Sequence, residues 1–279
     1  MCLLVPFPAI LLRLSIGRGM ATAVTFAATG IVALVFGNQP AFYYLAQFAL
    51  IAIVLPELLC KGWDGSRSIA WIISANLLLW SLAAATITFV KGVNIHQQAV
   101  ETINGSFARA LDMYERSGFK GEELAMMKQS LQLIAELLVR AYPAFIVVLM
   151  ILVAAFNLML IKRFASRLPL VPQISAFTEF RNPEALVWLL IAAGFAMLVD
   201  NPVINTPALN VLVVLSVIYF LQGLAVALAV IARSTFAATF RIMLYLMLIF
   251  QPYIAIPLTA IGIFDLWSDF RTPRKQENL

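Results

Sequence analysis

Long apolar blocks separated by short polar segments dominate the pattern of this chain. Seven of the blocks hold about 18 to 25 residues, the length of α-helix that crosses the hydrocarbon core of a bilayer. They occupy residues 20–37, 42–60, 69–91, 141–162, 183–199, 208–232 and 242–264. An eighth block, residues 3–12, is shorter and contains two prolines. The pattern predicts an all-α fold, a polytopic transmembrane helix bundle of about seven to eight hydrophobic segments.

One long polar interval divides the chain into three parts. Residues 1–91 and residues 141–279 each hold about four membrane segments, and the second part ends in a short polar tail. Residues 92–140 between them show apolar positions at helical spacing in two runs. The first run is Val100, Ile103, Phe107, Leu111 and Tyr114, and the second is Leu124, Met127, Leu131, Ile134 and Leu138. We predict a helical hairpin whose second arm continues into the 141–162 span.

The charged residues indicate the sidedness of the membrane segments. Only 12% of the residues are charged and 62% are hydrophobic, whereas soluble domains are about 25% charged. Ten cations fall on alternate loops, and such residues accumulate on the cytoplasmic side. They are Arg13, Arg18, Lys61, Arg67, Lys162, Arg163, Arg167, Arg181, Arg233 and Arg241. The hairpin is therefore expected outside the cytosol, either as a cap resting on the membrane or as a lid over an outward-facing site. The net charge of +5 follows this sidedness and does not imply nucleic-acid binding.

The basic C-terminal tail does not fit this alternation. Counting crossings places it outside the cytosol if residues 242–264 form one kinked crossing, which is our prediction. The stretch 242–267 would measure about 39 Å as helix, which is too short for two crossings. Pro252 and Pro257 allow an alternative, in which the stretch forms a re-entrant pair and returns the tail to the cytosol.

A few polar side chains lie inside the apolar blocks. They are Gln47, Asn76, Asn157, Tyr219, Gln222 and Gln251. Tyr219 and Gln222 are three residues apart and share one helix face, and Gly223 allows a neighbouring helix to come close. We predict that Tyr219, Gln222 and Gln251, with Asn76, line a solute cavity under the hairpin. The alternative is that these side chains only hydrogen-bond between helices.

Other residues receive structural predictions. Asn182 followed by Pro183 predicts a helix start, with Asn182 as N-cap and Pro183 as the first helical residue. Asp265 and Asp269 lie four apart at a helix C-terminus, where the helix dipole disfavours anions. We expect them to pair with Arg271 or Arg274 and not to bind a metal, because two carboxylates alone are a poor cage.

No cluster of catalytic residues is evident, so we expect neither an enzyme nor a cofactor. Glu57, near the end of its span, is the sole candidate catalytic acid in an apolar block, and the single histidine, His96, is expected to be solvated. Cys2 and Cys60 show neither metal-type nor redox spacing. The N-terminus has no basic residue before its apolar part, which argues against a signal peptide.

Several stretches in order resemble a known family. They are "PFPAILLRLSIGRG", "MKQSLQLIAELLVRAYPA", "FTEFRNPEALVWLLIAAG", "ALNVLVVLSVIYFLQGLAVA" and "GIFDLWSDFR". They resemble the YybS-like family of uncharacterised bacterial membrane proteins over essentially the whole chain. The resemblance implies a location in the bacterial inner membrane. It also implies a further transmembrane helix before the Pro-x-Pro segment. This sequence begins inside that segment, so the helix is either missing or lies upstream of its first residue. The family's spanning pattern is similar to that of the substrate-binding subunits of energy-coupling-factor vitamin transporters, at the level of the fold.

Two functions follow as expectations. The first is binding or transport of a small solute between transmembrane helices. This function would need a separate energising module, because the chain has no nucleotide-binding loop. The second is a membrane scaffold or assembly protein that binds another protein. Polar residues that converge on one cavity would favour solute binding, and polar residues used singly between helices would favour a scaffold.

Overall fold

The computed structural model describes residues 2–165, 174–268 and 270–271, and the regular structure in these residues is entirely helical. The α-helices are α1 (Phe7–Ser15), α2 (Arg18–Phe36), α3 (Asn38–Cys60), α4 (Gly65–Lys91), α5 (Ile95–Arg116), α6 (Glu122–Phe164), α7 (Ala185–Met197), α8 (Pro202–Ile231), α9 (Ala237–Phe250) and α10 (Ala255–Ser268). Short 3-10 helices are η1 (Cys2–Leu4), η3 (Phe177–Glu179) and η4 (Pro252–Ile254). The predicted all-α fold is confirmed for these residues.

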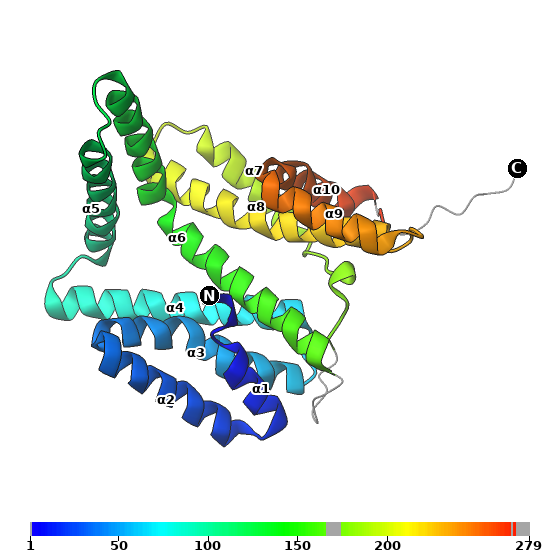
Figure 1. The fold of residues 1–279 in the computed structure, drawn as a ribbon. Coiled ribbons are helices and arrows are strands. Elements are labelled where there is room, and N and C mark those ends of the chain that lie inside the picture. Colours follow the sequence, from blue (N-terminus) through cyan, green and yellow to red (C-terminus); the bar gives the residue numbers. More distant parts are fainter. Residues whose placement is uncertain (1, 166–173, 269, 272–279) are drawn as a thin grey trace, which may run out of the picture.

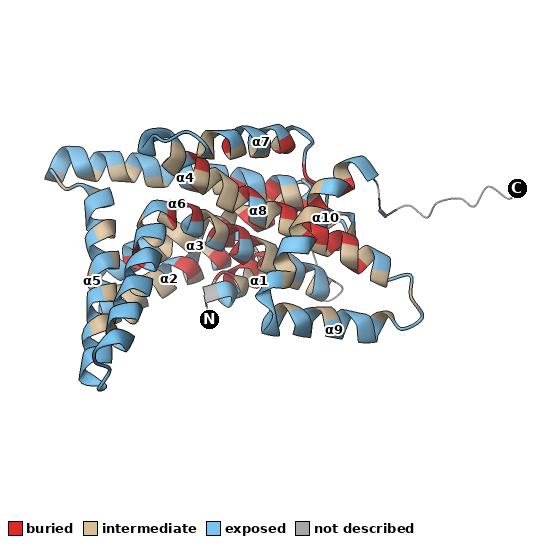
Figure 2. Cartoon of the chain, turned by 90° about the horizontal axis from the view of Figure 1, so that it is seen from above, coloured by how far each residue is buried: buried red, intermediate tan, exposed pale blue. Residues whose placement is uncertain are grey.

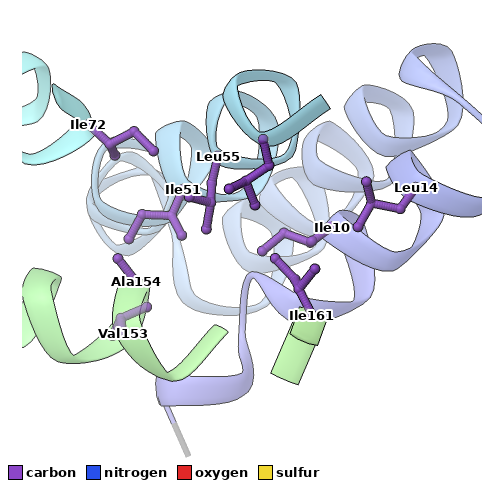
Figure 3. Packing of buried hydrophobic residues seen from close by; sticks show 9 residues of the cluster. Ile10, Leu14, Ile51, Leu55, Ile72, Val153, Ala154 and Ile161 are labelled. Atoms are coloured by element: carbon purple, nitrogen blue, oxygen red, sulfur yellow. The ribbon is translucent and has the colours of Figure 1, made fainter. Parts of the chain in front are cut away.

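The first four helices form one group, against which the second half of α6 packs (Figure 1). The side chains at this contact come from α1, α3, α4 and α6 (Figure 3). They are Ile10, Leu14, Ile51, Leu55, Leu59, Ile72, Val153, Ala154 and Ile161. In a bilayer, close packing of such side chains stabilises helix contacts, because lipid tails are as apolar as the side chains themselves.

Helix α6 runs diagonally between this group and the helices α7 to α10 (Figure 1). It has 43 residues, which corresponds to about 65 Å of helix. A bilayer core is about 30 Å thick, so one part of α6 extends beyond it. The second arm of the predicted hairpin therefore continues into the next span without a break, through Pro143.

The first arm, α5, packs against the first part of α6. Figure 1 shows α5 running crosswise to α4. The apolar stripe predicted from the spacing is the half-buried side of α5, at Val100, Ile103, Phe107 and Leu111. The extracytoplasmic location of this pair of helices stays a prediction.

Helix α8 is the centre of the second group. It contacts α6, α7 and α10, and the contact with α10 is the most extensive. Figure 2 shows the buried residues concentrated on α8, α10 and the neighbouring part of the bundle. Neither α5 nor α9 has a buried residue.

Five helices in the described residues are long and apolar enough to cross a membrane, namely α2, α3, α4, α6 and α8. Helix α7, in the block predicted as 183–199, has only 13 residues. That is about 20 Å of helix, shorter than a bilayer core of about 30 Å. The bent pair of α9 and α10 would make a sixth if it were one span. The expected count of seven to eight spanning segments is therefore not confirmed, although several helices have the length and composition of membrane spans.

The block predicted as 242–264 consists of two helices, α9 and α10. The chain bends by 113° at the break between them, which turns it partly back on itself. Arg271, just after α10, lies within hydrogen-bond distance of the carbonyl oxygens of Thr178 and Phe180. The tail thus begins on the same side as the segment before α7. This geometry favours the re-entrant pair over the single kinked crossing that we predicted.

Candidate functional site

Two glycines bring α8 and α10 into direct backbone contact. A Cβ atom at Gly223 would lie 1.7 Å from the carbonyl oxygen of Leu258, and one at Gly262 would lie 2.0 Å from the carbonyl oxygen of Tyr219. No side chain fits at either position. The close approach predicted at Gly223 is confirmed, and it places Gln222 of α8 beside Asp265 of α10.

Gln222 is fully buried and bonded on both ends of its amide. Its Oε1 accepts a hydrogen bond from the backbone N–H of Asn182 at 3.0 Å. Its Nε2 donates to Oδ2 of Asp265 at 3.1 Å. Gln222 therefore faces a stretch of non-helical backbone before α7, whose polar groups need partners inside a membrane protein.

Arg271 completes this network. Its guanidinium donates to Oδ2 of Asp265 at 2.9 Å and to the carbonyl oxygens of Thr178 at 2.8 Å and Phe180 at 2.7 Å. Asp265 is buried, so its charge needs a neighbouring cation. The expected pair of Asp265 with Arg271 is present, whereas Asp269 and Arg274 lie outside the described residues. No group of three or more potential metal ligands occurs among the residues that the structure describes.

Asn182 does not cap α7, so that prediction was wrong. The N-cap residue is Glu184 and the helix begins at Ala185, so Pro183 also lies before the helix. The side-chain amide of Asn182 instead donates to the carbonyl oxygen of Ile218 in α8, at 3.3 Å. Asn182 is buried, and α8 offers an acceptor for its backbone N–H and another for its side-chain amide. Buried polar groups need such partners, so the side chain bonds to α8 and does not cap α7.

The four residues predicted to line one cavity are spread over three regions. Tyr219 and Gln222 lie at the α8–α10 contact, and the Tyr219 hydroxyl is buried without a described partner. Gln251 is exposed at the end of α9, beside an open groove of about 550 Å³ that α9 residues line. Asn76 lies on α4, which packs against α3 and α6. Their joint role in ligand binding stays a prediction, and the described contacts do not connect them.

Asn76 differs from the other buried amides of the spans. It is 1% exposed, and neither its Nδ2 nor its Oδ1 has a hydrogen-bond partner among the described residues. Trp80, one turn further along α4, buries its Nε1 without a partner as well. Each unpaired buried polar group costs about 1–3 kcal/mol, so these three atoms leave a strong local demand for hydrogen bonds.

Packing explains why Asn76 is enclosed. The buried positions of α4 are Gly65, Ser68, Ile72 and Asn76, which recur at helical spacing. This face contacts α6, where a Cβ atom at Gly65 would meet the side chain of Leu158 at 2.5 Å. The amide is therefore buried on the face of α4 that packs against the neighbouring helices.

Aromatic rings of α3 cover Trp80. The ring of Tyr43 stacks on it with centroids 5.8 Å apart and an interplanar angle of 15°. Phe42 meets it edge-on at 6.1 Å. Tyr43 and Phe42 are 47% and 44% exposed, so the aromatic group opens on one side. Sequence reasoning found Asn76 but missed these aromatic residues. The four-residue spacing of Asn76 and Trp80 could have indicated from the sequence that both side chains lie on one face of α4.

A second polar contact missed from the sequence lies at Pro143. The side chain of Asn210, on α8, accepts from the backbone N–H of Ala144 at 2.8 Å and donates to the carbonyl oxygen of Arg140 at 2.7 Å. These groups are four residues apart on α6, so the amide bridges the helix next to its proline. Nearby, His96 lies 2.8 Å from the Tyr142 hydroxyl, although we expected it to be only solvated.

Comparison with known proteins gives the family. The family described as "Predicted membrane protein (DUF2232)" matches residues 1–266, and the chain belongs to it. No curated protein and no solved structure matches the chain.

Proposed function

We propose that this member of the DUF2232 family of predicted membrane proteins binds a small, flat, weakly polar solute between α3 and α4. The observation that carries the proposal is the Asn76 amide, which is buried with both its donor and its acceptor unpaired. A solute that offers one acceptor and one donor would satisfy it. The Trp80 N–H adds a second donor.

The aromatic residues define the shape of the solute. Tyr43 and Phe42 already stack against Trp80, and a planar ring would replace one of them at little cost in contact area. Both side chains are partly exposed, so they are free to move aside. Apolar walls with a few placed polar groups are typical of small-molecule sites.

The site has a defined depth in the membrane. Asn76 lies about 16 Å along α4 from its first residue, which is near the middle of a bilayer core of about 30 Å. Trp80 lies one turn closer to the end of α4 that leads into α5. With the predicted sidedness, the site faces outward and the α5–α6 pair is its lid. Uptake of the solute across a bacterial inner membrane would need a separate energising module, and the chain itself is no enzyme.

A scaffold function is the second candidate, and one observation favours it. Asn157 and Asn210 each bond to one neighbouring segment, and Gln222 bonds to two. Polar residues join helices in membrane proteins in this way. These three residues stabilise the fold in either function. The observation that favours solute binding over a scaffold is the Asn76 amide, because neither of its ends has a partner among the described residues.

Mass spectrometry of small molecules retained by the purified protein tests the proposal. Wild-type protein should release one class of planar solute, and the Asn76→Leu and Trp80→Phe variants should lose most of it. Gln251→Leu, which removes an exposed amide on another helix, is the matched control and should retain the solute. Retention by Asn76→Leu at the wild-type level would contradict the site, and loss in Gln251→Leu alone would place the solute in the α9 groove.

A further inference from the structure

Two arginines from different helices converge on one carboxylate at an end of the first helix group. Arg13 of α1 donates through Nε to Oε1 of Glu57, and Nη2 of Arg18 lies 2.8 Å from Oε2 of the same residue. The side chain of Arg13 is 10% exposed and that of Arg18 is 71% exposed. One arginine therefore holds the carboxylate from inside, and the other lies at the surface.

A third cation, Lys61, lies one turn after Glu57, where its backbone N–H donates to the Glu57 carbonyl oxygen at 3.1 Å. Lys61 follows Glu57 by four residues at the end of α3, and residues at this spacing are neighbours on a helix. We call Arg13, Arg18, Lys61 and Glu57 the cationic cluster. Its single carboxylate leaves an excess of two positive charges. Arg18 is also the first residue of α2, whose start has neither a side-chain cap nor an acidic residue.

We propose that the cationic cluster binds the phosphate of an anionic phospholipid headgroup. The cluster lies where α2 begins and α3 ends, and both helices are long and apolar enough to span the bilayer. Lipid phosphates lie at such an end. Arginine donors match phosphate oxygens in pairs, and basic pockets between transmembrane helices are known to hold lipid headgroups.

Neighbouring side chains fit the acyl chains of the same lipid. Ile16, just before α2, is 64% exposed, and Met20, in its first turn, is 46% exposed. The apolar surface continues along α2 at Phe26 and Ile31, which are also exposed. A lipid at the cationic cluster would therefore place its phosphate on Arg18 and Lys61 and its chains along α2. Free phosphate would gain only the first of these contacts.

Native mass spectrometry with defined lipids tests this site. The full chain is purified with phosphatidylglycerol or with zwitterionic phosphatidylcholine, and retained lipids are counted. The Arg18→Gln, Lys61→Gln double variant should bind phosphatidylglycerol about tenfold or more weakly, because each surface cation near a headgroup contributes measurably. The control double variant Arg233→Gln, Arg241→Gln removes two exposed cations near the α8–α9 connection and should bind like wild type. Equal loss in both double variants, or no loss in either, overturns the site.

The thiol of Cys60, beside Lys61, gives an independent readout. In a Cys2→Ser background, Cys60 is exposed and should react with a maleimide more slowly in phosphatidylglycerol nanodiscs than in phosphatidylcholine nanodiscs. The Arg18→Gln, Lys61→Gln variant should show no such difference. Protection by inorganic phosphate in detergent, without lipid, would overturn the assignment to a phospholipid.

Discussion

Buried polar residues in this protein differ in how many of their polar atoms have partners. Gln222 accepts from the backbone N–H of Asn182, and Asn157 donates to the carbonyl oxygen of Leu3, although its Oδ1 has no described partner. Asn76 and Trp80 have buried polar atoms without any described partner. The sequence predicted that Gln222 turns inward. It did not predict that the backbone N–H of Asn182 is its partner, because that contact depends on where α7 begins.

Replacing Gln222 tests its structural role. In Gln222→Leu, the Asn182 N–H loses its acceptor and Asp265 loses one donor, so the free energy of unfolding should fall by about 1–3 kcal/mol. Gln251→Leu, at the exposed end of α9, should change it little. Thermal unfolding in detergent measures both variants. Equal losses in the two variants would show that the amides act together, contrary to the structure.

Replacing Asp265 tests the buried ion pair. Asp265→Asn leaves the Arg271 charge buried without compensation, which costs about 3–5 kcal/mol in other proteins. The midpoint of thermal unfolding should therefore fall, and adding calcium or a chelator should change neither protein. A stability loss that appears only when divalent ions are removed would indicate a metal site instead.

Among the elements, α7 and the α9–α10 pair show where the sequence pattern stops being sufficient. Apolar block length located α2, α3, α4 and α8 closely, because an uninterrupted span needs only helix and lipid. It misjudged α7, since the helix covers only Ala185–Met197 of that block. The backbone just before the block is satisfied by Gln222 of α8 and by Arg271 instead of by helix. Composition also cannot distinguish a kink from a bend of 113° at Pro252. The burial of Asn76 also depends on how α4 packs against its neighbours, which block length does not predict.

The glycine contact of α8 and α10 gives a prediction about helix packing. Gly262→Ala would force a methyl group against the backbone of Tyr219, which is unable to move aside like a side chain. Stability should fall by about 1–3 kcal/mol or more. Gly194→Ala is the matched control, because nothing lies within 4 Å of its added Cβ and alanine favours helix. If both variants are as stable as wild type, α8 and α10 do not touch through these glycines.

At the scale of the whole molecule, a re-entrant α9–α10 pair would remove the conflict between the basic tail and the alternating loops. Arg271 contacts Thr178 and Phe180, which lie in the segment predicted to be cytosolic. A cytosolic tail agrees with the tendency of Lys and Arg to accumulate there. The predicted sidedness places the α5–α6 pair on the opposite side.

Cysteine labelling with an impermeant reagent tests this arrangement. In a cysteine-free background, Lys120→Cys between α5 and α6 should react in intact cells. Lys275→Cys in the tail should react only after lysis. Labelling of the tail in intact cells would restore the single kinked crossing, and protection of residue 120 would reverse the predicted sidedness.

The most direct test of the proposed solute site compares the stability of ligand-free wild type and Asn76→Leu. Leucine has nearly the same size and removes a buried amide without partners, so the ligand-free variant should unfold at a higher temperature, by about 1–3 kcal/mol in free energy. Added solute should then stabilise only the wild type. Asn157→Leu removes an amide whose Nδ2 donates to the carbonyl oxygens of Leu3 and Val153. Its free energy of unfolding should therefore fall below that of the wild type, whereas that of Asn76→Leu should rise. An Asn76→Leu protein that is destabilised like Asn157→Leu would mean that Asn76 holds helices together, and the solute site would be wrong.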